Sequence, residues 1–191
     1  MCQDNHAWFA IQVSPRHELT TAKILRNKGL EEFVPLYKSR RQWSDRQKDL
    51  WLPLFTGYVF CRFSAKAKLP VVTTPGVIRI VGSNKGPDPI SDDEIASLRM
   101  AAQLPANIHP YPYLAIGTKV KIEEGPFAGL EGILINQKNR SHLVLSLDLV
   151  QRSVAIDINS CRINVVSDLN EGIYGPQFML TQTYSQTSIN A

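Results

Sequence analysis

Three groups of residues in this sequence have types that carry out chemistry in other proteins: a glycine-rich stretch, four histidines and an acidic run. The stretch Gly117–Gly132 places glycines at 125, 129 and 132 after alternating valine and isoleucine. Such glycines cradle phosphate when they lead from a strand into a helix. Here another strand-like run follows Gly132, and no Lys-Ser/Thr pair is present. We therefore predict a tight connection between two strands, in which glycine allows close backbone approach and Phe127 plugs one end.

The histidines and the acidic run form no catalytic or metal-binding pattern in the sequence. The histidines are scattered, at positions 6, 17, 109 and 142. In "SDDE" (91–94), Ser91 and Glu94 have the spacing of a capping box, and the helix dipole explains the acids. The three cysteines are dispersed without a CxxC pair, which argues against a disulfide framework or zinc site and fits a reducing cytoplasm. We predict a non-enzymatic protein with no catalytic residue, metal or cofactor.

The charge of the chain is uneven. The net charge is +4, but residues 1–105 hold 15 Lys/Arg against 10 Asp/Glu, whereas residues 106–191 hold 6 against 7. Nine basic and four acidic residues fall within Arg16–Lys48. This balance suits a polyanion near the N-terminal half, although a solvated charged face explains it equally well. No run approaches the roughly 20 apolar residues of a membrane span, so we expect no membrane partner.

The first 105 residues have the pattern of an α+β domain. Ser14 and Pro15 suit the start of a helix, and Gly29 suits its end. The predicted strands lie at 8–13, 33–43, 54–63 and 77–81, and the predicted helices at 14–28, 64–74 and 91–104. Strand 33–43 runs into a basic hairpin tip. The βαββαβ order of this domain, 1–105, predicts a ferredoxin-like layer.

The remaining chain divides into three further segments. Residues 106–114 are proline-rich and read as a linker. Residues 115–166 contain five short strand patterns, which predict a small β-barrel. Residues 167–191 are rich in Ser, Thr, Gln and Asn, which predicts a disordered tail.

The glycine-rich stretch resembles the KOW motif, an element of small SH3-like barrels. The matching positions are Gly117, Val120, Ile122, Gly125, Pro126, Phe127, Gly129 and Gly132. The runs "WFAIQV", "LFTGYVF", "TPGVIRIVG" and "PISDDEI" follow one another as in the N-terminal domain of the NusG family of transcription elongation factors. The resemblance covers about residues 7–166. Thr56 departs from the family's usual proline before Gly57.

This resemblance implies a two-domain factor that binds RNA polymerase and suppresses pausing and termination. "HPYPYL" and "SLDLVQRSVAIDI" are similar to specialised NusG paralogues of surface-polysaccharide operons, the RfaH-like group, which implies antitermination at specific operons. The KOW barrel would bind a ribosomal small-subunit protein or the termination factor Rho, through a region that includes Leu149 and Val150. We expect a cytoplasmic monomer.

The strand around Tyr58 is the expected polymerase-binding element. Residues 59, 61 and 63 point to one side, and residues 58, 60 and 62 to the other. If the first set packs on helices, an uncovered aromatic patch on the opposite face would imply a partner. The resemblance assigns docking on the clamp helices of the largest polymerase subunit to Phe55, Tyr58 and Phe60, supported by Trp8. From the residues alone, an ordinary core or a homodimer seam remains open.

An RNA-binding protein with an RRM-like domain and a KOW module is the alternative. "TGYVFCRF" fits the RNA-recognition strand at Gly57, Tyr58, Phe60 and Phe63, but Thr56 and Val59 do not fit. The βαββαβ order is shared, so topology does not separate the two. The barrel after the linker favours the NusG family.

The basic residues of the N-terminal half are the expected DNA-binding side. By resemblance, this side faces the non-template DNA strand, where Lys and Arg hold phosphates and other side chains choose bases. The residues that carry this expectation are Arg16, His17, Lys23, Arg26, Arg40, Arg41, Thr73 and Thr74.

The barrel is expected to be permanent. Some RfaH-like relatives store this domain as a helical hairpin that masks the polymerase site. Here residues 143–150 alternate with a period of two, and the β-branched residues of 153–158 are poor helix formers. The three glycines would each cost about 1 kcal/mol inside a helix. We expect the linker to leave this barrel separately mobile.

Overall fold

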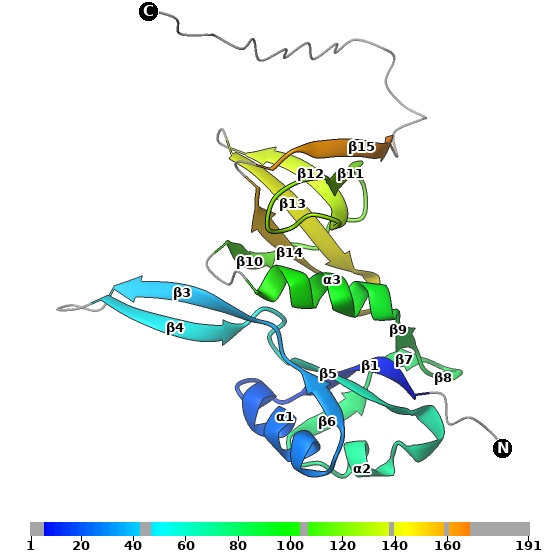
Figure 1. Cartoon of the computed structure of the whole chain (residues 1–191). Coiled ribbons are helices and arrows are strands. Elements are labelled where there is room, and N and C mark those ends of the chain that lie inside the picture. Colours follow the sequence, from blue (N-terminus) through cyan, green and yellow to red (C-terminus); the bar gives the residue numbers. More distant parts are fainter. Residues whose placement is uncertain (1–5, 43–46, 104–106, 138–139, 159–160, 169–191) are drawn as a thin grey trace, which may run out of the picture.

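The two most apolar strands of the N-terminal half pair at the centre of an antiparallel sheet. The computed structural model describes residues 6–42, 47–103, 107–137, 140–158 and 161–168 (Figure 1). The larger elements of the N-terminal domain are β1 (His6–Val13), α1 (Glu18–Asn27), β2 (Glu31–Phe33), β3 (Leu36–Gln42), β4 (Gln47–Pro53), β5 (Tyr58–Ser64), α2 (Leu69–Val72), β6 (Val77–Ile80) and α3 (Asp92–Ala102). Its short elements are a 3₁₀ turn (Ala65–Ala67), β7 (Gly82–Ser83), β8 (Gly86–Pro87) and β9 (Pro89–Ile90).

The strand order of this domain is that of a ferredoxin-like fold. The sheet runs β2-β5-β1-β6, with β9 also paired to β1, and its pairs are antiparallel. The hairpin β3-β4 is an insertion between β2 and β5 and pairs only with itself. The predicted α+β class and βαββαβ order are confirmed. A third helix, α3, follows the final strands.

Helix α1 starts later than the sequence predicts. Residues 14–17 form a turn instead, because Arg16 adopts the left-handed φ of 68° and the Ser14 N–H donates to the Gly76 carbonyl at 2.8 Å. The buried residues at 18, 21, 22 and 25 have the spacing of one helix face. Gly29 ends the helix as predicted: the N–H of Leu30 reaches the carbonyl of Leu25, as in a Schellman motif.

Helix α3 begins with the predicted capping box. The Ser91 hydroxyl accepts from the Glu94 N–H at 3.1 Å, and the Glu94 carboxylate accepts from the Ser91 N–H at 3.0 Å. These reciprocal bonds satisfy two of the donors that a helix N-terminus leaves free. The acidic run therefore serves the helix start.

The second domain is a β-barrel built from short antiparallel strands. Its elements are β10 (Ile108–Tyr111), β11 (Thr118–Ile122), β12 (Glu131–Gln137), β13 (Arg140–Leu147), a 3₁₀ turn (Asp148–Val150), β14 (Arg152–Asp157) and β15 (Ile163–Asp168). The sheet order is β10-β14-β13-β12-β11-β15. Residues 143–150 lie in β13 and the 3₁₀ turn, so this arrangement has the barrel form and not the helical hairpin.

The glycine-rich stretch connects β11 to β12, as predicted. Gly129 has φ of 93°, and its N–H donates to the Ile122 carbonyl at 2.8 Å, which closes the turn. At Gly132 an added Cβ would lie 2.6 Å from the Val144 carbonyl, so this position needs glycine for close strand approach. Phe127 is buried and belongs to the core cluster that fills the barrel interior.

The predicted linker is not wholly a linker. Residues 108–111 form β10, which pairs with β14 as an edge strand of the barrel sheet. Proline is tolerated there because an edge strand needs fewer ladder donors. The barrel therefore begins before residue 115. Strand β15 reaches residue 168, and the rest of the predicted tail, 169–191, lies outside the described residues.

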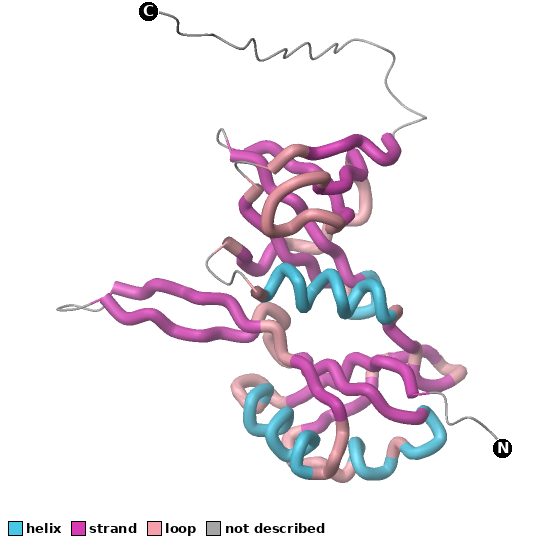
Figure 2. Tube along the Cα trace, in the orientation of Figure 1, coloured by secondary structure: helices cyan, strands magenta, loops and turns pink. Residues whose placement is uncertain are grey.

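Helix α3 lies between the sheet and the barrel (Figures 1 and 2). Helices α1 and α2 cover the other sheet face, which buries Val59, Cys61 and Phe63 as predicted. A second core cluster extends from Trp8 and Phe60 through α3 to the barrel interior without a break. In this arrangement the two domains share one core, which differs from the expectation of a separately mobile barrel.

Candidate functional site

The aromatic side chains expected to form an uncovered patch are mostly buried. Phe55 and Phe60 are 1% and 0% exposed, and their rings meet edge to face with centroids 5.4 Å apart. Trp8 is 2% exposed, whereas Tyr58 is partly exposed. The predicted alternation of side chains along β5 is correct, because these rings lie on the sheet face opposite Cys61. The expected exposure is wrong, because α3 and the barrel pack over this face.

Helix α3 is fixed to this aromatic face by an arginine. The Arg99 guanidinium lies 4.9 Å from the Trp8 ring centroid and 5.4 Å from that of Phe33. It also donates to the Glu31 carboxylate at 2.8 Å. Cation–π contacts of this kind contribute about 0.5–2 kcal/mol each. The rings are therefore held beneath α3 by both packing and charge.

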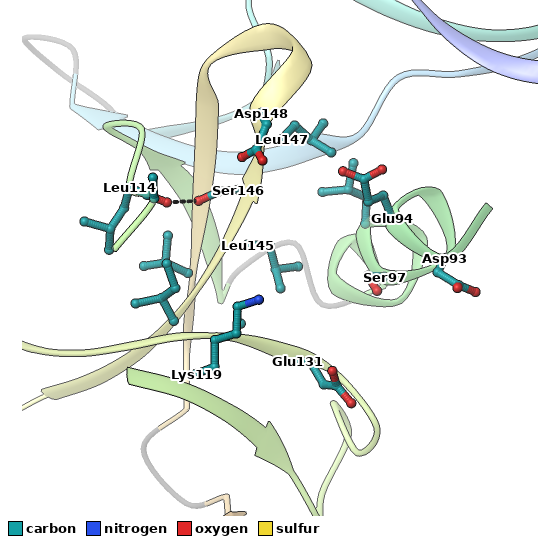
Figure 3. Close-up of a pocket in the computed structure, with 15 residues that line it drawn as sticks. Asp93, Glu94, Ser97, Leu114, Lys119, Glu131, Leu145, Ser146, Leu147 and Asp148 are labelled. Atoms are coloured by element: carbon teal, nitrogen blue, oxygen red, sulfur yellow. Dashed lines mark hydrogen bonds between the residues drawn. The ribbon is translucent and has the colours of Figure 1, made fainter. Parts of the chain in front are cut away.

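A cleft of about 360 Å³ separates α3 from the barrel. Figure 3 shows its lining, with α3 on one side and strands β11, β12 and β13 on the other. Four acids and one base line it: Asp93, Glu94, Glu131, Asp148 and Lys119. The Ser146 hydroxyl donates to the Leu114 carbonyl at the barrel wall. The barrel thus faces α3 across an acidic, partly apolar gap.

The basic residues of α1 and of the turn before it are exposed. The side chains of Arg16, His17 and Lys23 are exposed. Arg26 is exposed too, but its guanidinium pairs with the Glu32 carboxylate. Gly76 packs against His17, so the N-terminus of α1 and the segment before β6 form one surface. Arg16, His17 and Lys23 are therefore accessible to solvent, and their contact with DNA stays a prediction.

Of the two threonines expected beside this surface, only one is accessible. Thr73 is exposed. Thr74 is 2% exposed, donates to the Pro70 carbonyl at 2.8 Å and accepts from the Lys28 ammonium at 2.8 Å. A base cannot reach Thr74 while these bonds persist, so its expected role in base choice is wrong for this structure. The sequence did not single out Lys28, which joins the end of α1 to this segment.

The hairpin carries its basic residues away from α1. Figure 1 shows β3 and β4 projecting from the domain body. Lys38 lies 2.7 Å from the Asp49 carboxylate and Arg40 lies 3.4 Å from it. The Lys38 hydrogen bond, with a smaller contribution from Arg40, lowers the pKa of Asp49. Arg41 belongs to β3, but its side chain lies outside the described residues.

Two further titratable features are a buried thiol, which the sequence placed in the core, and a cluster on the barrel that it did not predict. Burial raises the pKa of the Cys61 thiol to about 12, which makes it an inert core residue. His109, His142 and Asp157 meet on the barrel, although the sequence spacing gave no sign of a cluster. Burial lowers the pKa of His109. Only the pairing of β10, β14 and β13 brings these three residues together.

The family model for "Transcription termination factor nusG" matches residues 6–99, which span the ferredoxin-like sheet and most of α3. The chain belongs to the NusG family. Relatives extend the similarity into the barrel. The NusG of Campylobacter jejuni is 27% identical over 165 residues, covering 80% of this chain and 93% of that protein. The NusG of Borreliella burgdorferi is 23% identical over 180 residues, covering 81% and 96%.

A solved structure shares the NusG-family fold. The structure titled "Domain interaction in Thermotoga maritima NusG" is 19% identical, covers 85% of this chain and 98% of its own, and has a TM-score of 0.53. The family consists of non-enzymatic transcription factors, so the chain is not an enzyme. The RRM-like alternative is not favoured, because the matching family model and relatives are those of NusG. Among the described residues, no helix is both long and apolar enough to cross a membrane.

Proposed function

We propose that this NusG-family factor suppresses transcriptional pausing and termination, and that it does so at particular operons. The observation that carries the proposal is the family match over the N-terminal sheet domain, joined in one chain to a barrel with the KOW glycine pattern. NusG-family factors bind RNA polymerase. The operon-specific role rests on the resemblance of "HPYPYL" and the 146–158 segment to specialised paralogues. A gene position at the head of a polysaccharide operon would support it, and a position among housekeeping genes would contradict it.

The proposed polymerase contact is the face around Tyr58, against the clamp helices of the largest subunit. Tyr58 is the accessible member of the aromatic group, and Phe55 and Phe60 support it from beneath. Trp8 sits under Arg99 and supports the same face. Because the barrel and α3 share a core with these rings, full access requires the barrel to move away.

The proposed DNA contact is the outer face of α1 with the adjoining segment before β6. Arg16, Lys23 and the partly neutralised Arg26 would hold phosphates of the non-template strand, and His17 and Thr73 would contact bases. Arg40 and Arg41 on the hairpin would meet nucleic acid at a separate place, because the hairpin projects from the body.

The proposed partner of the barrel is a ribosomal small-subunit protein or Rho. Leu149 and Val150 lie in the 3₁₀ turn after β13. Val150 is 6% exposed and Leu149 is partly buried against the shared core. Binding there would therefore also favour the arrangement in which the barrel has left α3. We place this activity in the cytoplasm and expect a monomer.

The experiment that tests the polymerase proposal is a titration of polymerase with the Tyr58→Ala variant. Aromatic anchors cost about 2 kcal/mol or more on truncation, which is roughly a thirtyfold weaker Kd. Phe55→Ala is unsuitable, because emptying a buried phenylalanine site costs about 3–5 kcal/mol of stability. Ile116→Ala serves as the control, because it removes an exposed apolar side chain from the loop between β10 and β11. An unchanged Kd for Tyr58→Ala, with a normal circular dichroism spectrum, rejects this contact.

A further inference from the structure

Three side chains with metal-binding atoms converge on one side of the barrel. They come from three neighbouring strands: His109 from β10, His142 from β13 and Asp157 from β14. One ligand atom of each lies within 4.8 Å of the other two. The imidazole rings of His109 and His142 meet edge to face with centroids 5.6 Å apart. Two nitrogens and one oxygen therefore lie close enough together to reach one ion.

The strand register produces this convergence. His142 is the direct cross-strand partner of Asp157, so both side chains lie on one face of the sheet. His109 pairs with Ala155, which is two residues before Asp157 and therefore on the same face. A small apolar cluster that includes Val144 and Ala155 continues this face. The three ligands are thus held by backbone pairing beside an apolar neighbourhood.

Two of the ligand atoms are buried and make no hydrogen bond of ordinary geometry. His142 is 9% exposed. Its Nδ1 lies 2.7 Å from Asp157 Oδ1, but within the described part of the chain neither atom has a hydrogen bond of acceptable geometry. Buried polar atoms are nearly always hydrogen-bonded, so a buried contact between two such atoms without a normal hydrogen bond needs an explanation. A cation would accept lone pairs from both atoms at once.

We propose that His109, His142 and Asp157 bind a divalent transition-metal ion of the zinc class, with solvent completing the coordination. Imidazole nitrogens suit zinc and its neighbours, whereas calcium and magnesium prefer all-oxygen shells. Zinc ligands stand about 2.0–2.1 Å from the ion, which places tetrahedral ligand atoms roughly 3.3 Å apart. Binding would require His142 Nδ1 and Asp157 Oδ1 to separate from their present 2.7 Å. This metal site is a property separate from the proposed role in transcription and does not depend on it.

The bound ion would link the first barrel strand, β10, to strands β13 and β14. β10 is an edge strand, and its other connection leads back toward α3. An ion held by β10, β14 and β13 adds bonds across the pairing that keeps this edge strand in place. It therefore stabilises the folded barrel and keeps residues 108–111 out of the interdomain connection.

The experiment measures metal binding by the full chain, freed of any histidine tag. Zn²⁺ is titrated in competition with a chromophoric chelator, and Co²⁺ is added separately to read its visible absorption. We expect one equivalent of Zn²⁺, an intense Co²⁺ band typical of a four-coordinate site, and a higher thermal midpoint with Zn²⁺. His109→Gln and Asp157→Asn each remove one ligand with little change in volume. His6→Gln, in the other domain, is the matched control.

The variants decide whether the cluster is the site. Each ligand variant should weaken Zn²⁺ binding by more than the roughly 10–100-fold loss that follows when only a group orienting a ligand is removed. The control should bind like the parent chain. Circular dichroism of each variant shows whether the fold is kept. Absence of stoichiometric Zn²⁺ binding by the parent chain, or equal binding by folded His109→Gln and Asp157→Asn, overturns the proposal.

Discussion

Single residues on and beside α1 divide into those free to bind a polyanion and those already occupied. Arg16 and Lys23 are exposed, while Arg26 is neutralised by Glu32 and Thr74 is closed off by Lys28. The surface around α1 therefore has fewer unpaired positive side chains than the number of Lys and Arg residues in the sequence suggests. Solvent-exposed cations of this kind act mainly through released counterions.

Reversing two of these charges should weaken the action of the factor inside the elongation complex. The Arg16→Glu, Lys23→Glu double variant should suppress pausing less and show a shallower salt dependence. Each single-strand phosphate contact contributes about 0.7 to the log–log salt slope, so two lost contacts reduce it by roughly 1.4. A pausing assay across a salt series measures this.

A matched pair of reversals provides the control for that assay. Lys66→Glu with Lys68→Glu changes the total charge equally, at exposed positions beside α2. It should leave the slope near that of the parent chain. If both double variants behave alike, the α1 face is only a solvated surface.

At the scale of elements, α3 depends on its first turn. Ser91→Ala removes the hydroxyl that accepts from the Glu94 N–H, and a lost N-cap costs about 1 kcal/mol. Urea unfolding should show this loss. Ser97→Ala lies in the middle of the same helix and should be neutral or slightly stabilising, because alanine is the better helix former. Equal stability of Ser91→Ala and the parent chain would show that the cap contributes nothing.

Short-range sequence patterns predicted these elements well. They did not predict which other elements pack over each face of the sheet. The capping box, the Gly29 helix end and the glycine turn each depend on residues a few positions apart, so the sequence contains their full cause. The alternation of β5 likewise predicts two distinct faces. What lies on each face depends on α3, which follows about thirty residues later, and on a barrel beyond it. The burial of Phe55 and the histidine cluster could not be predicted for the same reason.

At the scale of the whole molecule, an acidic cleft lies between α3 and the barrel. Among the described residues that line it, Lys119 is the only base, together with four acids. Lys119→Glu should therefore open the arrangement by like-charge repulsion and raise the radius of gyration measured by X-ray scattering. The barrel should keep its β-type nuclear magnetic resonance shifts. Binding of polymerase, and of Rho or the small-subunit protein, should increase.

Lys85→Glu is the control for the opened arrangement. Lys85 is exposed in the turn between β7 and β8, outside the cleft lining. It carries the same charge change and should leave the radius of gyration unchanged. A Lys119→Glu variant with unaltered dimensions and unaltered binding would show that the cleft charges do not govern the arrangement.

The pairing of edge strand β10 with the barrel determines the length of the linker between the domains. With residues 108–111 paired into the barrel, only residues 103–107 join the two bodies. Five extended residues reach at most about 18 Å. A tether this short keeps the barrel near α3 at an effective concentration on the order of millimolar. A protein that binds the Tyr58 face must therefore compete with the barrel, which stays tethered nearby. Separation of β10 from β14 would lengthen the linker between the domains and so weaken this competition.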